Sequence, residues 1–138
     1  MKKMLTVLLI LTTFTVCKAP EWKSLYVEKA EGIQKYKPLV YAVTWVESKH
    51  GQYVWNPKEE AVGWFQIRQV RVDDYNKRTG ASYTLEDFYD YHLSEKMFLY
   101  YADGKSFEHA ARSLNGSGPM TLRYWADVQK VLYNNKNN

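Results

Sequence analysis

One carboxylate in the chain stands where it could act as a general acid. Glu47 follows an apolar run that begins after Pro38 and is interrupted only by Thr44. A carboxylate at the end of such a run loses hydration, which disfavours the anion and raises the pKa of the acid. A carboxylic acid that keeps its proton near neutral pH is what cleavage of a glycosidic bond requires. Glu47 is therefore the candidate catalytic acid, and the alternative is a solvated residue where a buried helix meets water.

The element that would position Glu47 is a short helix over residues 38–48. Proline suits the first turn of a helix because its missing N–H would be unpaired there anyway. Gly51 supplies a stop after the last turn. Because nearly every face of this segment is apolar, we expect the helix to be buried all round. The acid would then lie at the end of a rigid apolar element.

Three further segments complete a pattern with Glu47-Ser48. Residues 61–67 read AVGWFQI, residues 110–116 read AARSLNG, and residues 124–128 read YWADV. In this order and spacing they resemble the motifs of the soluble lytic transglycosylases, the SLT family of the lysozyme-like superfamily. That family has a helix ending in Glu-Ser, a small-x-Gly-x-x-Gln segment, an Ala-rich helix ending in an Asn-x-Gly turn, and a late Tyr. The resemblance covers residues 37–132.

The resemblance implies a mainly α, lysozyme-like domain with a glycan groove. It also implies cleavage of the bond between N-acetylmuramic acid (MurNAc) and N-acetylglucosamine (GlcNAc) in bacterial peptidoglycan. Glu47 would protonate the bond oxygen and then take the proton of the muramoyl 6-hydroxyl, giving a 1,6-anhydro product without water. The acetamido group of the substrate would steady the cationic intermediate, so that no second carboxylate is required.

By the same resemblance, four residues besides the acid would serve the substrate. Ser48 would form a hydrogen bond in the groove near the acid, and Gln66 would bind the sugar backbone through its amide. Asn115 would line the groove, and Tyr124 would place its hydroxyl by the acid or the acetamido group. Trp64 would form a stacking wall in the groove or pack in the core.

Two departures from the family pattern concern the shape of the groove. A leucine precedes Asn115 where the family has an aromatic residue, and a Trp-Phe pair follows Gly63 where smaller aliphatic residues are usual. Plainer interpretations also stay open. Gln66 would be an exposed strand residue, Asn115 part of a simple turn, and Tyr124 a core residue.

Other functions remain open besides the transglycosylase. A hydrolytic lysozyme (muramidase) needs a second carboxylate to activate water, and Glu59, Glu60, Asp73 and Asp74 are the candidates. A non-catalytic cell-wall-binding or assembly protein would carry a degenerate site, so that replacing Glu47 would change nothing measurable. A basic DNA-binding domain is the most distant alternative, because the chain begins like an exported protein.

The N-terminus predicts export. Lys2 and Lys3 precede an apolar run that ends at Val16 and is too short to span a bilayer comfortably. This layout is typical of a secretory signal peptide over residues 1–20, and it predicts a periplasmic or extracellular protein. Cys17 is the only cysteine, so no internal disulfide can form. Its place after the apolar run also allows a lipid anchor and an outer-membrane lipoprotein, although the residues before it fit that signal poorly.

Composition indicates one globular domain over residues 21–133. A chain of 138 residues can bury a real core, and its net charge of +4 is mild. That charge favours an anionic polymer such as a bacterial wall and is compatible with nucleic acid, but it decides neither; we expect no nucleic-acid partner because the chain begins like an exported protein. We expect no cofactor, and no metal because the histidines at 50, 92 and 109 lie apart. Besides peptidoglycan, a secretion or conjugation machine is an open candidate partner.

The remaining elements are read from periodicity and caps. Helices are predicted over residues 21–35, 69–78, 91–102, 107–114 and 120–133. Residues 62–67 are expected to be short and extended, residues 50–61 a loop, and residues 134–138 a polar tail. Asp90 and Ser106 are expected to cap helices, and Gly80 and Gly104 to end them.

Two side-chain patterns add to these elements. The last helix is expected to turn five apolar residues inward: Leu122, Trp125, Val128, Val131 and Leu132. Basic residues 68, 71, 77 and 78 could form a basic face on one helix, and the ordinary interpretation is a solvated surface.

Overall fold

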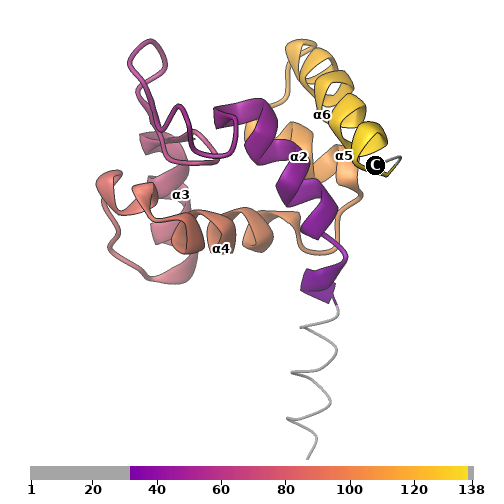
Figure 1. The fold of residues 1–138 in the computed structure, drawn as a ribbon. Helices are drawn as coiled ribbons and strands as arrows, with labels where there is room; N and C mark the ends of the chain where they lie inside the picture. The colour runs from indigo at the N-terminus through magenta and orange to yellow at the C-terminus, as the bar shows by residue number, and fades with distance from the viewer. Residues whose placement is uncertain (1–31, 137–138) are drawn as a thin grey trace, which may run out of the picture.

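In the computed structural model the chain is described over residues 32–136, where it is mainly α-helical with a small antiparallel sheet (Figure 1). The elements are α2 (Lys37–Ser48), β1 (Trp55–Asn56), β2 (Ala61–Val62), β3 (Ile67–Arg68), α3 (Gln69–Thr79), the 3-10 helix η1 (Glu86–Tyr89), α4 (Tyr91–Ala102), α5 (Phe107–Leu114) and α6 (Met120–Lys136). The prediction of a mainly α fold with a small extended segment near residues 62–67 is confirmed. The predicted signal peptide and Cys17 lie outside the described residues, and the helix predicted over residues 21–35 lies mostly outside them.

Helix α2 forms where it is predicted, but it is not buried on all sides. Leu39 and Val43 are fully buried, whereas Tyr41 is 45% exposed and Trp45 is 40% exposed. Tyr41 and Trp45 lie four residues apart and therefore form one outward stripe. The expectation of a helix buried all round is wrong. Its neighbours cover only part of its circumference, and large apolar rings are often left at a protein surface.

The chain reverses sharply at the end of α2. Lys49, His50 and Gly51 have φ angles of 52°, 54° and 80°, all in the left-handed region. The helix thus ends at Ser48, as predicted, and the left-handed residues after it begin with Lys49, two positions before Gly51. Glycine is required at position 51 for space, because an added Cβ would lie 2.5 Å from the ring of Trp64. This close packing fixes the direction in which the chain leaves the residues around Glu47.

The sheet lies between α2 and α3 in the sequence. Val62 in β2 pairs with Trp55 of β1 on one side and with Ile67 of β3 on the other, both antiparallel. Strand β1 lies in a stretch predicted as loop. Gly63 follows β2 with φ 76°, and an added Cβ would lie 2.1 Å from the carbonyl oxygen of Phe88. The turn between β2 and β3 is therefore packed directly against η1.

Gly63→Ala is expected to destabilise the protein much more than the matched change Gly80→Ala. Both glycines have a left-handed φ, but nothing lies within 4 Å of a Cβ added at Gly80. We expect a loss in unfolding free energy of about 1 kcal/mol for Gly80→Ala, from backbone strain alone. For Gly63→Ala we expect about 3 kcal/mol or more, because steric overlap is added. Urea unfolding of both variants measures this, and equal losses would contradict the close contact with Phe88.

The predicted caps are confirmed. Asp90 accepts a hydrogen bond from the N–H of Leu93 at 2.7 Å, and Ser106 accepts one from the N–H of His109 at 3.2 Å. Gly80 ends α3 with φ 72°. These residues fix the beginnings of α4 and α5 and the end of α3 through local hydrogen bonds and backbone geometry.

Helix α6 is longer than predicted, and four of its five predicted inward residues pack on the core: Trp125, Val128, Val131 and Leu132. It continues to Lys136, so that the first three residues of the predicted tail are helical. Val128 and Thr121 are buried, whereas Leu122 is 53% exposed, and its predicted inward position is wrong. Successive residues of an α-helix are turned by about 100°, which moves Leu122 away from the face that carries Thr121.

Helix α2 is the centre of the fold. In Figure 1 it runs between α3 and α4 on one side and α5 and α6 on the other. Its beginning is anchored by Tyr36, whose hydroxyl lies 2.6 Å from the carbonyl oxygen of Ala102 and 2.7 Å from that of Lys105. The core around it consists of buried apolar side chains from every helix: Leu39, Val43, Val72, Phe88, Met97, Phe98, Ala110, Ala111 and Val128. Glu47 thus lies at the end of the most enclosed helix.

Candidate active site

A cleft of about 340 Å³ opens at the end of α2. Four elements form its walls: the end of α2, the turn into β3, the first turns of α3, and the loop after α5. The lining residues are Glu47, Phe65, Gln66, Ile67, Arg68, Val70, Arg71, Asp74, Leu114, Asn115 and Gly116. The cleft therefore brings together three of the four segments that the sequence pattern connects.

Glu47 is the central titratable group of this cleft. Its side chain is partly buried, and burial raises its pKa from the ordinary value of 4.5 to about 7. Tyr124, Asn115 and the positive charge of Arg68 act in the opposite direction, and the negative charge of Glu59 adds to the increase. Burial outweighs the opposing contacts, so the carboxyl is about half protonated at neutral pH.

Asn115 reaches Glu47 across the cleft. Its Nδ2 donates a hydrogen bond to Oε1 of Glu47 at 3.3 Å, although the two residues are 68 positions apart. Asn115 follows directly after α5 and is exposed. The amide therefore holds one carboxyl oxygen while the cleft remains open to a ligand.

Tyr124 lies on the inner side of Glu47. It is on α6, does not line the cleft, and its hydroxyl oxygen is buried. The hydroxyl is near enough to lower the pKa of Glu47, yet it has no hydrogen bond of good geometry with any described residue. The pKa of Tyr124 itself is raised well above its ordinary value, first by burial and then by the charge of Glu47. The hydroxyl thus lies by the acid, while the ring packs on the core, so the plainer prediction of a core residue also holds for the ring.

Tyr124→Phe is expected to raise the pKa of Glu47 above about 7, because the hydroxyl favours the carboxylate form. The free energy of unfolding should change little, since a buried hydroxyl without a good partner contributes little net stability. Side-chain carboxyl NMR over a pH titration measures the first effect, and urea unfolding measures the second. Tyr53→Phe, at a ring that is 66% exposed, is the control. A lower or unchanged pKa of Glu47 in the Tyr124 variant would contradict this arrangement.

Gln66 lines the cleft and also holds the turn between β2 and β3. It has a left-handed φ of 49°, and its Nε2 donates to the carbonyl oxygens of Tyr53 at 3.0 Å and Gly63 at 2.9 Å. Its Oε1 has no partner among residues 32–136. The amide can therefore accept a hydrogen bond from a ligand, but its N–H donors are used within the protein.

Ser48 does not line the cleft, which corrects its predicted place in the groove. It is 1% exposed, and its hydroxyl lies 2.9 Å from the carbonyl oxygen of Trp64. The Oγ of Ser48 also accepts a hydrogen bond from the N–H of Gly51 at 2.9 Å. The side chain of Ser48 points inward because the chain folds back over it after α2. Ser48 therefore supports the position of Glu47 and cannot contact a bound sugar.

Trp64 also lies outside the cleft lining. Its ring is partly buried and packs edge-on against Tyr91, with ring centres 4.9 Å apart, and it covers Gly51 from the other side. Of the two predicted roles, the structure supports packing rather than a stacking wall beside Glu47. The indole thus joins the end of α2 to α4.

The four candidate second carboxylates are placed differently. Asp74 lines the cleft, but it accepts hydrogen bonds from Arg78 at 2.8 Å and from Tyr101 at 2.7 Å. The Arg78 hydrogen bond is the main reason why the pKa of Asp74 is lowered. The other three are exposed and do not line the cleft: Glu59, Glu60 and Asp73. Asp74 is therefore committed to structural contacts, and Glu59 acts on Glu47 through its charge.

Sequence reasoning missed the two arginines of the cleft. Arg68 and Arg71 are assigned above to a solvated basic face, but both line the cleft. Arg68 directly follows the Gln66-Ile67 pair, and Arg71 comes three residues later. Their closeness in sequence to Gln66 is the signal that could have placed them near the site. Periodicity alone could not distinguish an outward arginine from one that faces Glu47.

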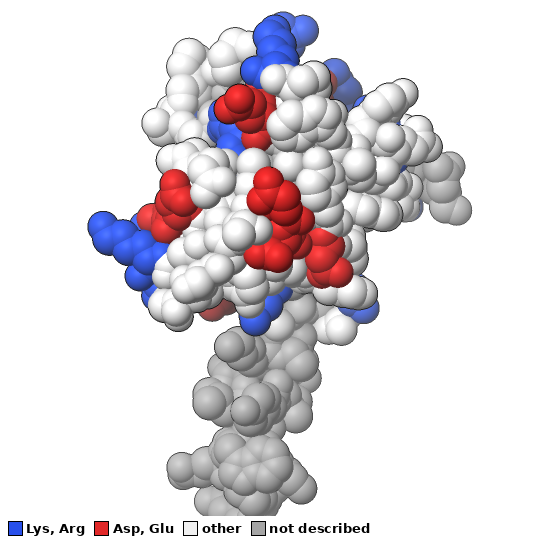
Figure 2. Space-filling model, turned by 90° about the vertical axis from the view of Figure 1, so that its left-hand side faces the viewer, with Lys and Arg blue, Asp and Glu red and all other residues white. Residues whose placement is uncertain are grey.

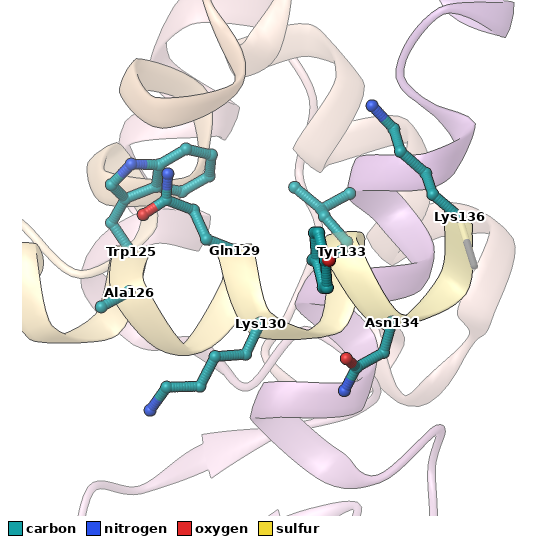
Figure 3. A pocket seen from close by; sticks show the side chains of 8 residues that line it. Trp125, Ala126, Gln129, Lys130, Tyr133, Asn134 and Lys136 are labelled. Atoms are coloured by element: carbon teal, nitrogen blue, oxygen red, sulfur yellow. The ribbon is translucent and has the colours of Figure 1, made fainter.

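A larger hollow of about 690 Å³ runs along α6, away from Glu47. Figure 3 shows the labelled side chains Trp125, Gln129, Lys130 and Tyr133 projecting from that one helix. All its described lining residues belong to α6, and none is acidic. We therefore place the candidate site in the smaller cleft, where an acid with a shifted pKa meets side chains from several elements.

Other kinds of site find little support in the described part of the chain. No group of three His, Cys, Asp or Glu side chains between residues 32 and 136 could hold a metal ion. Figure 2 shows acidic and basic side chains in separate small groups on one face, rather than one continuous basic patch. No helix in the same range is long and apolar enough to cross a membrane.

Comparisons with family models, curated proteins and solved structures find no match to this chain. What the cleft can do chemically is therefore the basis for a functional proposal. The cleft offers a carboxyl near its midpoint of titration, an amide that holds it, a free amide oxygen, and two guanidinium groups.

Proposed function

We propose that this protein is a peptidoglycan lytic transglycosylase that cleaves the MurNAc–GlcNAc bond with Glu47 as its one catalytic acid. The observation that carries the proposal is the state of Glu47 in an open cleft. Its pKa is raised to about 7 by burial, and Asn115 holds one of its oxygens at 3.3 Å. A carboxyl of this kind can release a proton to a glycosidic oxygen near neutral pH.

The reaction uses Glu47 twice. Its proton goes to the oxygen between the two sugars, the bond from that oxygen to C1 of MurNAc breaks, and GlcNAc leaves as an alcohol. The acetamido group stabilises the positive charge at C1. The Glu47 carboxylate then accepts the proton of the 6-hydroxyl while that oxygen bonds to C1, which gives the 1,6-anhydro sugar and restores the acid.

A pKa near 7 suits both halves of this cycle. A carboxyl with the ordinary pKa of 4.5 would hold its proton too weakly to supply it at neutral pH. The Asn115 amide donates to the carboxyl oxygen, and it holds the group in place while the proton leaves and returns. Tyr124 stands on the buried side and favours the carboxylate, which limits how far burial raises the pKa.

The hydrolytic alternative depends on a second carboxylate that is free to activate water. Asp74 is in the cleft, but its carboxylate already accepts hydrogen bonds from Arg78 and Tyr101, so it is poorly placed to activate water. Glu59 is the remaining candidate that influences Glu47.

Cleavage of peptidoglycan by either mechanism requires export, because peptidoglycan lies outside the cytoplasmic membrane. The N-terminal sequence predicts such export.

Mass spectrometry of digested peptidoglycan tests the proposal. The wild-type protein should produce 1,6-anhydro-muramic ends, and Glu47→Gln should produce none. Reducing ends instead would establish a muramidase and direct attention to Glu59. If neither protein cleaves while both bind glycan strands, the protein is a wall-binding or assembly protein.

A further inference from the structure

Two arginines line the cleft beside Glu47, and they differ in what holds them. Arg71 donates to the carbonyl oxygen of Ser113, and its guanidinium lies 4.6 Å from the ring centre of Tyr101. Arg68 is partly buried, and no residue between 32 and 136 forms a hydrogen bond or an ion pair with its guanidinium. Arg71 is therefore a structural tie between α3 and α5, whereas the donors of Arg68 are available to a ligand.

The acidic side chains of the cleft do not neutralise Arg68. Asp74 is held by Arg78 and Tyr101, and Glu47 is largely uncharged below pH 7 because burial raises its pKa to about 7. Helix α3 begins directly after Arg68 and has no acidic residue in its first turn, which adds to the positive potential there. Partial burial of an unpaired charge is unfavourable, and a bound anion relieves that cost.

The position of Arg68 relates it to the reacting bond. Its backbone is fixed by pairing with Ala61 in the sheet, so the side chain begins from a rigid strand. Its charge acts on the pKa of Glu47, which places the guanidinium within electrostatic reach of the acid. An anion held by Arg68 in this cleft would therefore lie close to the bond that Glu47 protonates.

We propose that Arg68 binds a carboxylate carried by the sugar next to the cleaved bond. This inference rests on the proposed function and narrows its substrate to an anionic glycan. In peptidoglycan the carboxylate has two sources: the lactyl group of MurNAc in strands without peptides, and the stem peptide in intact strands. A guanidinium can hold either one through two parallel N–H···O bonds, whereas a neutral glycan offers it no such partner.

The test compares three glycan substrates that share one backbone. They are intact peptidoglycan, strands stripped of peptide by an amidase, and the same stripped strands with their carboxylates converted to methylamides. Kinetics are measured at about pH 5.5, where Glu47 is protonated in every variant. Arg68→Gln should raise KM roughly 10- to 100-fold on carboxylate-bearing strands, as loss of a charge-assisted hydrogen bond predicts. It should leave KM on the methylamide strands nearly unchanged.

Two further variants give the control and the rescue. Lys77→Gln removes the same charge from an exposed position on α3 and should leave KM unchanged on all three substrates. Arg68→Lys keeps the charge but loses the planar fork, so its KM should lie between those of the wild type and Arg68→Gln. If Arg68→Gln does not fold, Arg68→Lys and the wild-type comparison between carboxylate and methylamide strands still decide the question.

The substrates also distinguish the two sources of the carboxylate. A KM effect that is larger on stripped strands assigns Arg68 to the lactyl group, and one that is larger on intact strands assigns it to the stem peptide. If Arg68→Gln raises KM equally on methylamide strands, or if Lys77→Gln has the same effect, the inference is wrong while the proposed function stands. If the wild-type protein cleaves none of the carboxylate-bearing strands, the proposed function fails and the inference fails with it.

Discussion

Glu47→Gln should lower the rate of peptidoglycan cleavage by about 10³-fold or more, because the glutamine amide has no proton to give to the glycosidic oxygen. The substitution keeps the shape of the side chain, and Asn115 can still donate to its oxygen at this position. We therefore expect a loss in kcat with little change in KM. Release of soluble fragments from purified peptidoglycan, measured at about pH 6, gives both constants.

The pH dependence of the wild-type protein follows from the same residue. The acid must begin each cycle with its proton, and burial raises its pKa to about 7. The ratio kcat/KM should therefore be nearly constant below about pH 6 and fall about tenfold per pH unit above about pH 8. An acid with the ordinary pKa of 4.5 would instead place this fall near that pH.

Glu59→Gln is the matched control, because it makes the same chemical change at an exposed carboxylate. The negative charge of Glu59 contributes to the raised pKa of Glu47. Its removal should move the alkaline fall of kcat/KM to slightly lower pH and leave the maximum rate unchanged. If Glu59→Gln instead abolishes cleavage, Glu59 is the second carboxylate of a hydrolase and the single-acid mechanism is wrong.

The parts of the fold that could be predicted are those decided by neighbouring residues. Asp90 and Ser106 cap their helices through backbone N–H groups three positions ahead, so the sequence alone contains both partners. Gly80 supplies the left-handed residue that ends α3. The raised pKa of Glu47 could also be predicted from neighbouring residues, because the apolar run directly before Glu47 already indicates burial.

The parts that could not be predicted depend on how distant segments fold back. Ser48 follows the acid in sequence, which suggests a place in the groove, but its hydroxyl is bound to the carbonyl oxygen of Trp64, sixteen residues away. Arg68 looks like part of a charged helix surface, but the sheet pairing turns it into the cleft. Tyr41 and Trp45 have large apolar side chains, which predicts core positions, but both are exposed. Whether they are covered depends on how the other helices pack around α2.

The fold should be more stable at alkaline pH when Glu47 is replaced by Gln. Burial raises the pKa of Glu47 from 4.5 to about 7, so the folded protein holds this proton more tightly than the unfolded chain does. The stability that the proton supplies is fully present below about pH 4.5 and is lost as the pH rises through about 7. The corresponding loss in unfolding free energy is about 3 kcal/mol at alkaline pH.

Urea unfolding of the wild type and Glu47→Gln at about pH 5 and about pH 8.5 measures this effect. Near pH 5 the two proteins should differ little, because a protonated carboxyl and an amide have similar hydrogen-bonding needs. At the higher pH the variant should be more stable by up to about 3 kcal/mol, because only the wild type must then bury a charge. Glu59→Gln removes only a minor contribution to the raised pKa of Glu47, so its gain at alkaline pH should be much smaller. A pH-independent difference for Glu47→Gln would mean that Glu47 titrates normally. Burial of the Glu47 carboxylate thus costs the fold stability at alkaline pH. The same free energy raises the pKa of Glu47, so that the proton is still held near neutral pH.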